Sequence, residues 1–202
     1  MDPHEALKDQ IPTVLVLTAS DERQAAQFRS QLQLRDRLGM LHELDAWRVV
    51  PDPGGMRVGS GGSTIHVLRS IAGAEPVEKA VNGRRILILH GGGKSRRIPA
   101  YAICGKLFCP VPVPSNSALP ATLFDLQLAR YLKLPLRPDG QVVMCSGDVL
   151  LRFDPAEVEL NRAGLTGVAA LEPVDEACDH GVFARIGEAG MVEEFWQKPN
   201  PD

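Results

Sequence analysis

The chain has 202 residues, of which 44% are hydrophobic and 23% charged, a composition typical of globular proteins. Its formal net charge of −3 excludes the global basic surplus with which proteins hold nucleic acid. No apolar run approaches the roughly 20 residues of a membrane-spanning helix, so no membrane association is expected.

The first part of the chain predicts two strands separated by a helix. Residues 13–19, TVLVLTA, are an apolar, β-branched run of the length expected for a buried parallel strand. Ser20 is a candidate N-cap for a helix that ends near Gly39. A second strand is predicted at 46–50, and the segment PDPGG stops it.

The next part predicts a glycine-rich loop, a helix and a third strand. The loop RVGSGGST follows the second strand, and Ser63 or Thr64 is placed to cap a helix that reaches about Ile71. Residues 73–84 are expected to form a surface connection. A third buried strand at 85–90 runs directly into a second glycine-rich loop, GGGKSRR.

The second half of the chain continues the alternation. A helix is predicted at 121–134 and a fourth buried strand at 141–146, with the proline-rich segment 109–120 as an extended loop within the same domain. Two more strands are predicted at 167–174 and 181–186. This order predicts an α/β fold with a mainly parallel sheet and helices on both faces.

Three polar or glycine-rich segments follow predicted strands. They are RVGSGGST after the second strand, GGGKSRR after the third and SGD after the fourth. Ligands of open parallel sheets bind beyond the carboxyl ends of the strands, so we expect all three segments to meet in one crevice. Successive glycine N–H groups can form an anion-binding nest there. Neither glycine loop matches a dinucleotide or P-loop fingerprint, and a ligand-free tight turn is the alternative for each.

The second glycine loop is followed by four cations, Lys94, Arg96, Arg97 and Lys106. Arginine grips phosphate through its planar fork and lysine supplies a point charge. Because the protein is net acidic, cations gathered at a glycine turn predict a phosphate site. A solvated basic loop is the alternative.

Single residues add three weaker expectations. Asp148 follows a buried strand beside these groups and is a candidate Mg²⁺ ligand, with an ordinary turn aspartate as the alternative. Lys198 precedes Pro199 and could reach a sugar-linked phosphate, although a surface lysine is the default. His90 ends a buried strand and is expected to satisfy backbone groups.

Cysteine spacing and the N-terminal segment bear on the compartment. None of the four cysteines forms a C-x-x-C pair, and the N-terminal MDPHEALKDQ is charged and polar, unlike a signal peptide. The sequence therefore predicts a reduced, cytoplasmic protein without a zinc site.

The motifs together resemble a known family. HGGGKSRRIPAYAICGK resembles the sugar nucleotidyltransferase signature of two glycines, a Ser/Thr, an arginine, a proline and a lysine. The order VLTASDERQAAQF, VPDPGGMRVGSGGST, TLFDLQLA, MCSGDVLL and DHGVF is similar to the fucose-1-phosphate guanylyltransferase family. That family also forms one half of bifunctional fucokinase/guanylyltransferases. The resemblance covers nearly the whole chain.

The resemblance implies a Rossmann-like nucleotidyltransferase domain over residues 1–202. Its expected reaction joins GTP and fucose 1-phosphate, or a related sugar 1-phosphate, to give a GDP-sugar and pyrophosphate, with Mg²⁺ as cofactor. The nucleotide-binding residues implied are Gly59, Ser60, Gly61, Gly62, Ser63, Thr64, Gly91, Gly92 and Ser95.

The resemblance also assigns the charged residues. Arg96 matches the signature arginine at the spacing of the wider superfamily, and Arg97 matches it at the spacing of the fucose branch. Lys106 matches the signature lysine, Lys198 the Lys-Pro step near the sugar, and Asp148 the metal aspartate.

One departure concerns the second metal aspartate of the superfamily, which this sequence does not supply. We therefore expect the chain to be an N-terminal fragment of a longer protein, for which the family suggests C-terminal β-helix and fucokinase domains. Two alternatives stay open: a transferase for another base or sugar, and a nucleotide-sugar-binding module without turnover.

Overall fold

The computed structural model describes residues 11–91, 101, 105–160 and 164–200. They belong to two compact units, residues 1–161 and 162–202. No helix in these described ranges is both long and apolar enough to cross a membrane.

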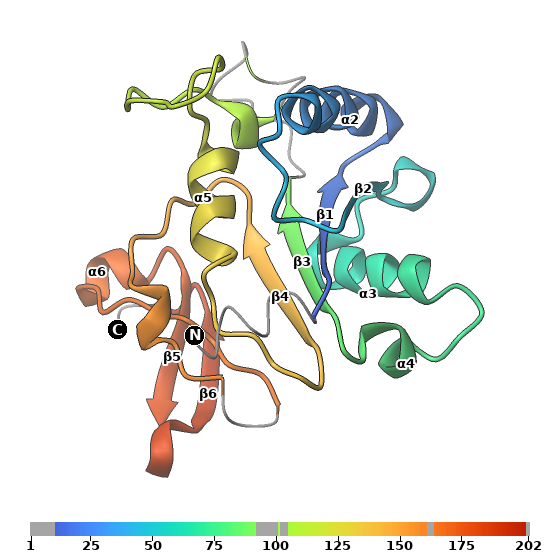
Figure 1. Ribbon diagram of the computed structural model, residues 1–202. Coiled ribbons are helices and arrows are strands. Elements are labelled where there is room, and N and C mark those ends of the chain that lie inside the picture. The colour runs from blue at the N-terminus through green and yellow to red at the C-terminus, as the bar shows by residue number, and fades with distance from the viewer. Residues whose placement is uncertain (1–10, 92–100, 102–104, 161–163, 201–202) are drawn as a thin grey trace, which may run out of the picture. The chain divides into compact units, whose positions relative to one another are not determined.

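The first unit is built on four parallel strands. Their spatial order is β2 (Ala46–Pro51), β1 (Thr13–Ala19), β3 (Arg85–His90) and β4 (Gln141–Ser146) (Figure 1). Each lies within one residue of its predicted range. The chain leaves β1 toward β2 and then crosses to β3 on the opposite side of β1, so the carboxyl ends of β1 and β3 flank a topological switch point.

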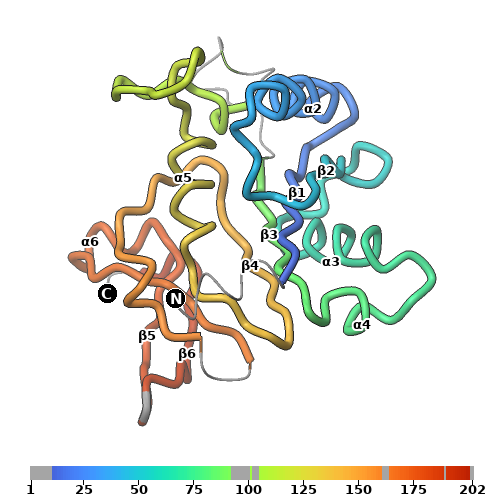
Figure 2. The backbone as a smooth tube through the Cα atoms, viewed as in Figure 1, coloured from blue at the N-terminus to red at the C-terminus, as the bar shows by residue number. Residues whose placement is uncertain are grey.

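Helices cover both faces of this sheet (Figure 2). Leu15 and Leu17 of β1 face a core that contains α2 (Glu22–Arg37) and α5 (Leu123–Tyr131). Val16 between them faces the other core, against α3 (Gly59–Ala72) and α4 (Val77–Val81). The alternation follows from the two-residue period of a strand. The predicted α/β, Rossmann-like class is therefore confirmed.

The helices of the first half of the chain differ in detail from the sequence prediction. Helix α2 is capped by Asp21 rather than Ser20, because the Asp21 carboxylate accepts a hydrogen bond from the Gln24 backbone N–H at 2.9 Å. Helix α3 (Gly59–Ala72) begins at the first loop glycine, so Ser63 and Thr64 lie inside the helix and do not cap it. The expected surface connection contains the short helix α4 (Val77–Val81).

Helix α5 is shorter than predicted at both ends. Thr122 and Asp125 form a capping box at its start, which fixes Leu123 as the first helical residue. The described residues of the first unit also form the short helices η1 (Pro53–Gly55), η3 (Lys106–Phe108) and η4 (Pro155–Glu157).

The second unit is an antiparallel hairpin of β5 (Gly181–Ile186) and β6 (Val192–Gln197). It also contains α6 (Val174–Ala177) and η5 (Glu188–Gly190). The strand predicted at 167–174 is wrong, since residues 165–173 have no regular structure and the helix starts at Val174. Instead β5 pairs with β6, where Phe183 lies opposite Phe195 with ring centroids 5.8 Å apart.

A buried ion pair joins α2 to α5. The Arg35 side chain is 1% exposed, and its Nε and Nη2 donate to the two oxygens of Asp125 at 2.7 and 3.0 Å. Its guanidinium also packs on the rings of Phe108 and Phe124. Burial acts to raise the pKa of Asp125, but hydrogen bonds from Arg35 and Thr122 outweigh burial and lower it. Phe108 belongs to η3, which also contains Lys106. The contact of Arg35 with Phe108 therefore packs η3 against α2 and α5.

Arg35→Met should lower the free energy of unfolding by on the order of 3–5 kcal/mol, because it leaves the Asp125 carboxylate buried without its partner. Urea unfolding at neutral pH measures this. Arg29→Met on the same helix is the control, since the Arg29 side chain is 37% exposed and should cost about 0–1 kcal/mol. Equal losses of unfolding free energy in the two variants would contradict a stabilising role for the buried Arg35–Asp125 pair. Because the folded pKa of Asp125 is lowered, its stabilisation is present above pH ~4 and is lost as pH falls below that value.

Candidate functional site

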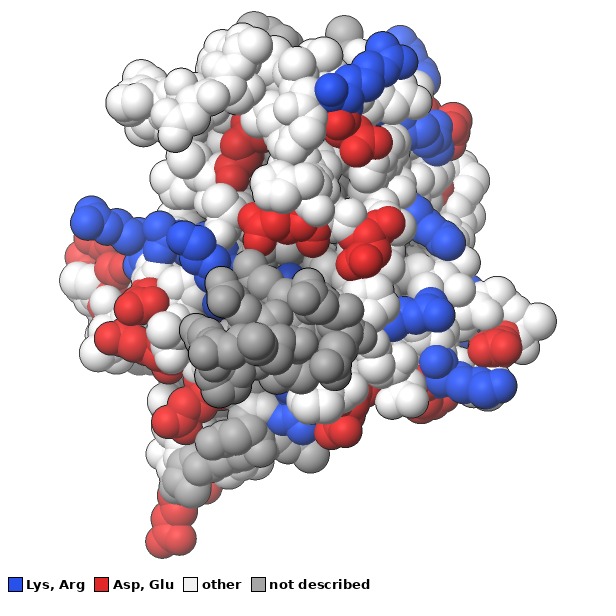
Figure 3. Space-filling model, viewed as in Figure 1, with Lys and Arg blue, Asp and Glu red and all other residues white. Residues whose placement is uncertain are grey.

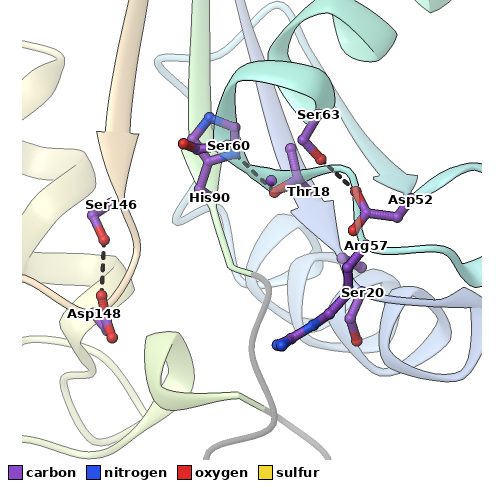
Figure 4. Close-up of a pocket in the computed structure, with 11 residues that line it drawn as sticks. Thr18, Ser20, Asp52, Arg57, Ser60, Ser63, His90, Ser146 and Asp148 are labelled. Atoms are coloured by element: carbon purple, nitrogen blue, oxygen red, sulfur yellow. Dashed lines mark hydrogen bonds between the residues drawn. The ribbon is translucent and has the colours of Figure 1, made fainter.

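A pocket of about 330 Å³ lies beyond the carboxyl ends of the four strands (Figure 4). This volume is within the range of small-ligand sites. Every strand of the sheet contributes through its last residues or the loop that follows it. The lining residues are Thr18, Ala19, Ser20, Asp52, Arg57, Gly59, Ser60, Ser63, His90, Ser146 and Asp148. The expected convergence of the first and third segments is thus confirmed.

His90 at the end of β3 links three elements across this pocket. Thr64 Oγ1 donates to the Ser60 carbonyl at 2.9 Å, so the His90 Nε2–H donates to Thr64 Oγ1 at 3.1 Å. The Thr18 hydroxyl then donates to His90 Nδ1 at 3.2 Å. The prediction that His90 satisfies backbone groups is wrong, because two threonine hydroxyls take both ring nitrogens.

The electrostatics keep this imidazole uncharged. Burial lowers the pKa of His90 below its ordinary value, although the negative charge of Asp52 opposes the shift. A neutral ring therefore fixes the start of α3 against β1 and β3 at physiological pH. Sequence reasoning missed this role because the two threonines come from distant elements.

The first glycine loop forms the opening turn of α3. Val58, the N-cap residue, gives no side-chain cap, so the first N–H groups of the helix have no such partner. Gly59 has φ of 72°, and a Cβ on Gly61 would meet nothing within 4 Å. Gly59 and Ser60 line the pocket. A helix N-terminus of this kind favours anions.

The other predicted loop residues have supporting roles in this structure. A Cβ on Gly62 would lie 2.8 Å from Val58 Cβ, so packing requires glycine there. Ser63 is buried and donates from Oγ to Asp52 Oδ1 at 2.5 Å. Thr64 is buried and holds His90.

Two predicted charged residues, 42 positions apart, contact each other at the pocket. Lys106 Nζ lies 2.9 Å from Asp148 Oδ2, and Ser146 Oγ donates to Asp148 Oδ1 at 2.8 Å. The hydrogen bonds from Lys106 and Ser146 lower the pKa of Asp148, so its carboxylate is an anion at neutral pH. The side chains of Lys106 and Asp148 are 35% and 45% exposed, so a ligand can reach both of them.

The donor set fits a magnesium ion that is shared with a substrate. Within the described part of the chain, no three His, Cys, Asp or Glu side chains are grouped so that they could hold a metal. Mg²⁺ needs only one or two carboxylates when phosphates and water supply its other ligands. The anionic, accessible Asp148 meets that requirement.

Several predicted residues lie outside this geometry. Gly92, Ser95, Arg96 and Arg97, together with Lys94, lie outside the described residues. Gly91 is described, and a Cβ there would lie 2.6 Å from the Phe28 ring, so packing demands a glycine. Lys198 belongs to the second unit, where its backbone N–H donates to the His180 carbonyl at 2.8 Å.

The surface charge agrees with the net charge. On the face shown in Figure 3, lysine and arginine side chains are interspersed with aspartate and glutamate rather than gathered into one basic surface.

Comparison with known proteins gives one consistent family. A family model described as the fucose pyrophosphorylase domain matches residues 78–202. The chain is 28% identical over 211 residues to the bifunctional fucokinase/GDP-fucose pyrophosphorylase of Arabidopsis thaliana, covering 92% of this chain and 20% of the relative. It is 30% identical to the fucose-1-phosphate guanylyltransferase of Mus musculus, covering 88% of this chain and 30% of the relative.

A bacterial relative adds to this set. The L-fucokinase/L-fucose-1-P guanylyltransferase of Bacteroides fragilis is 36% identical, over 79% of this chain and 18% of the relative. The chain thus spans less than a third of the length of each of these curated relatives. No solved structure matches it.

Proposed function

The chain belongs to the fucose pyrophosphorylase family, and from this premise we propose that it carries the nucleotide-binding site of a fucose-1-phosphate guanylyltransferase. Its substrates would be GTP and fucose 1-phosphate or a closely related sugar phosphate, and its products a GDP-sugar and pyrophosphate. The observation that carries the proposal is the contact of Lys106 with Asp148, which lines a pocket together with the start of α3, where Val58 gives no side-chain cap.

In the proposed reaction, an oxygen of the sugar phosphate attacks the α-phosphorus of GTP. The new P–O bond forms as the bond from the α-phosphorus to the bridging oxygen breaks, and pyrophosphate leaves with that electron pair. The sugar phosphate is already an anion near neutral pH, so no general base is required. Catalysis then depends on positioning and charge neutralisation by the protein.

The chain's own residues divide this work between two walls of the pocket. The N–H groups at Gly59 and Ser60 face nucleotide phosphate or ribose oxygens, with the helix dipole favouring negative charge. Lys106 exchanges its contact with Asp148 for the triphosphate and the departing pyrophosphate. We assign Arg96 and Arg97 to the same phosphates on the strength of the signature alone.

The Lys106–Asp148 contact costs little to open. Exposed ion pairs contribute about 0–1 kcal/mol to stability, so the pair is better suited to exchange than to support of the fold. Asp148 would then hold Mg²⁺, which when bound neutralises charge on the nucleotide phosphates. We also propose a cytoplasmic location, where Cys109, Cys145 and Cys178, all free thiols, stay reduced.

Nucleotide binding provides the first test. With Mg²⁺ present, GTP should raise the melting temperature of the protein more than ATP, UTP or CTP, because the nucleotide that binds the native state most tightly stabilises it most. A ligand at 100 times its Kd stabilises the native state by about 2.7 kcal/mol. Pyrophosphate release with GTP across a panel of sugar 1-phosphates then identifies the sugar. A larger shift with UTP would contradict guanylyl transfer, and no shift with any nucleotide would contradict the site.

A further inference from the structure

Asp52 contributes a carboxylate to the pocket beside the first turns of α3. It follows β2, and its backbone N–H donates to the Ala19 carbonyl at 2.8 Å, which fixes the residue against β1. Its carboxylate lines the pocket, where Ser63 Oγ donates to Oδ1 at 2.5 Å (Figure 4). Because Ser63 is itself buried in α3, the carboxylate is held in one orientation.

Both carboxylate oxygens keep acceptor capacity for a ligand, since each has two lone pairs and Oδ1 uses one of them for Ser63. Asp52 Oδ2 makes no hydrogen bond or ion pair with any residue that the structure describes, and Arg57, which also lines the pocket, does not pair with it. A carboxylate accepts hydrogen bonds and cannot donate them, so it suits the part of a nucleotide that offers hydrogen-bond donors.

The strands that precede Asp52 and Asp148 lie at opposite edges of the sheet, which separates a nucleoside site from a phosphate site. Asp52 follows the edge strand β2 and Asp148 follows β4, with β1 and β3 between them. Three strand spacings separate these ends by roughly 14 Å. A nucleotide that crosses β1 and β3 can therefore place its phosphates at Lys106 and Asp148 and its nucleoside at Asp52.

We propose that Asp52 selects the base by accepting two hydrogen bonds from guanine, one from N1–H and one from the 2-amino group. This inference rests on the proposed function. Guanine alone among the four bases presents two adjacent N–H donors on its Watson–Crick edge, and a carboxylate offers two acceptors in matching geometry. Adenine, uracil and cytosine each place an acceptor against the carboxylate there, which rejects them.

The test uses nucleotides that differ by one group. Dissociation constants for GTP, ITP, XTP and 2′-deoxy-GTP are measured with Mg²⁺ by calorimetry. The protein should bind ITP, which lacks the 2-amino group, on the order of tenfold more weakly than GTP. Asp52→Asn should weaken GTP by on the order of 10- to 100-fold. It should strengthen XTP, because the carboxamide donates to the xanthine O2 and accepts from N1–H.

Asp45→Asn is the matched control. Asp45 lies just before β2, at the opposite end from the pocket, where it accepts from the Thr13 backbone N–H at 2.7 Å. This variant should leave the ranking of the four nucleotides unchanged. A change of ranking in Asp45→Asn equal to that in Asp52→Asn would overturn the proposal.

Other outcomes show whether Asp52 contacts the base or the ribose, and whether this inference or the proposed function fails. Equal affinity for ITP and GTP in the unmodified protein overturns guanine selection by Asp52 while the proposed function stands. If 2′-deoxy-GTP binds weakly and Asp52→Asn removes that difference, the carboxylate contacts ribose, and the proposal is wrong. If no guanine nucleotide binds, the proposed function and this inference fail together. Loss of all binding in Asp52→Asn, with an unchanged melting temperature and no gain for XTP, also contradicts base selection.

Discussion

Asp148→Asn should abolish magnesium-dependent turnover and leave the fold intact. The substitution keeps the shape of the side chain and removes the charge that a hard cation requires. The side chain is 45% exposed and its ion pair contributes about 0–1 kcal/mol, so the melting temperature should hardly change. Pyrophosphate release at several Mg²⁺ concentrations measures the effect, and we expect a loss on the order of 10²-fold or more.

The control for this variant is Asp154→Asn. Asp154 lies six positions further on and caps η4 by accepting from the Ala156 backbone N–H at 3.0 Å. It should lose little activity. If Asp148→Asn falls less than about tenfold, equivalent to roughly 1.4 kcal/mol of barrier, Asp148 does not bind the metal.

The second large effect is expected at Lys106. Lys106→Ala should lower both kcat and kcat/KM by on the order of 10²-fold or more, because the ammonium is needed most as pyrophosphate gains charge. Lys79→Ala, at a side chain 71% exposed on α4, should change neither constant. Small, equal, salt-sensitive losses in both variants would instead indicate ordinary solvated charges.

An exchange of the two charges separates a phosphate contact from a structural ion pair. The double variant Lys106→Asp, Asp148→Lys preserves an ion pair across the same contact. It should nevertheless stay inactive, because the cation would stand where the metal ligand is needed. Recovery of activity in the double variant relative to each single variant would show that the pair serves the fold alone.

The strands were the most predictable part of this structure. β1 and β3 are continuous apolar runs because both faces of the sheet are covered. Such runs can be recognised as strands from the sequence alone. The start of α3 was not predictable, since GSGGST has the composition of a loop. Its Ser63 and Thr64 contact Asp52 and His90, which the local sequence does not reveal. The segment 167–174 has strand composition, but it pairs with no strand among the residues that the structure describes.

The site was predictable by residue type and less so by arrangement. Lys106 and Asp148 were each expected at a phosphate and metal site, and only the fold reveals that they touch. Asp52 and Asp148 share one sequence feature, because each is a carboxylate two residues after a predicted strand. The reasoning that selected Asp148 could therefore also have selected Asp52. His90 offered no comparable signal, because its two partners are 72 and 26 positions away.

One consequence of the Lys106–Asp148 contact concerns the order in which ligands enter. A polyphosphate bound by Lys106 would leave the Asp148 carboxylate open to a divalent cation, and Asp148 holding a cation would leave the Lys106 ammonium open to a polyphosphate. Thermodynamic linkage requires that each ligand then raise the affinity for the other by the same factor. The nucleotide and the cation would therefore bind cooperatively. Through this one contact of 2.9 Å, the affinity of the pocket for each ligand would be higher when the other is bound.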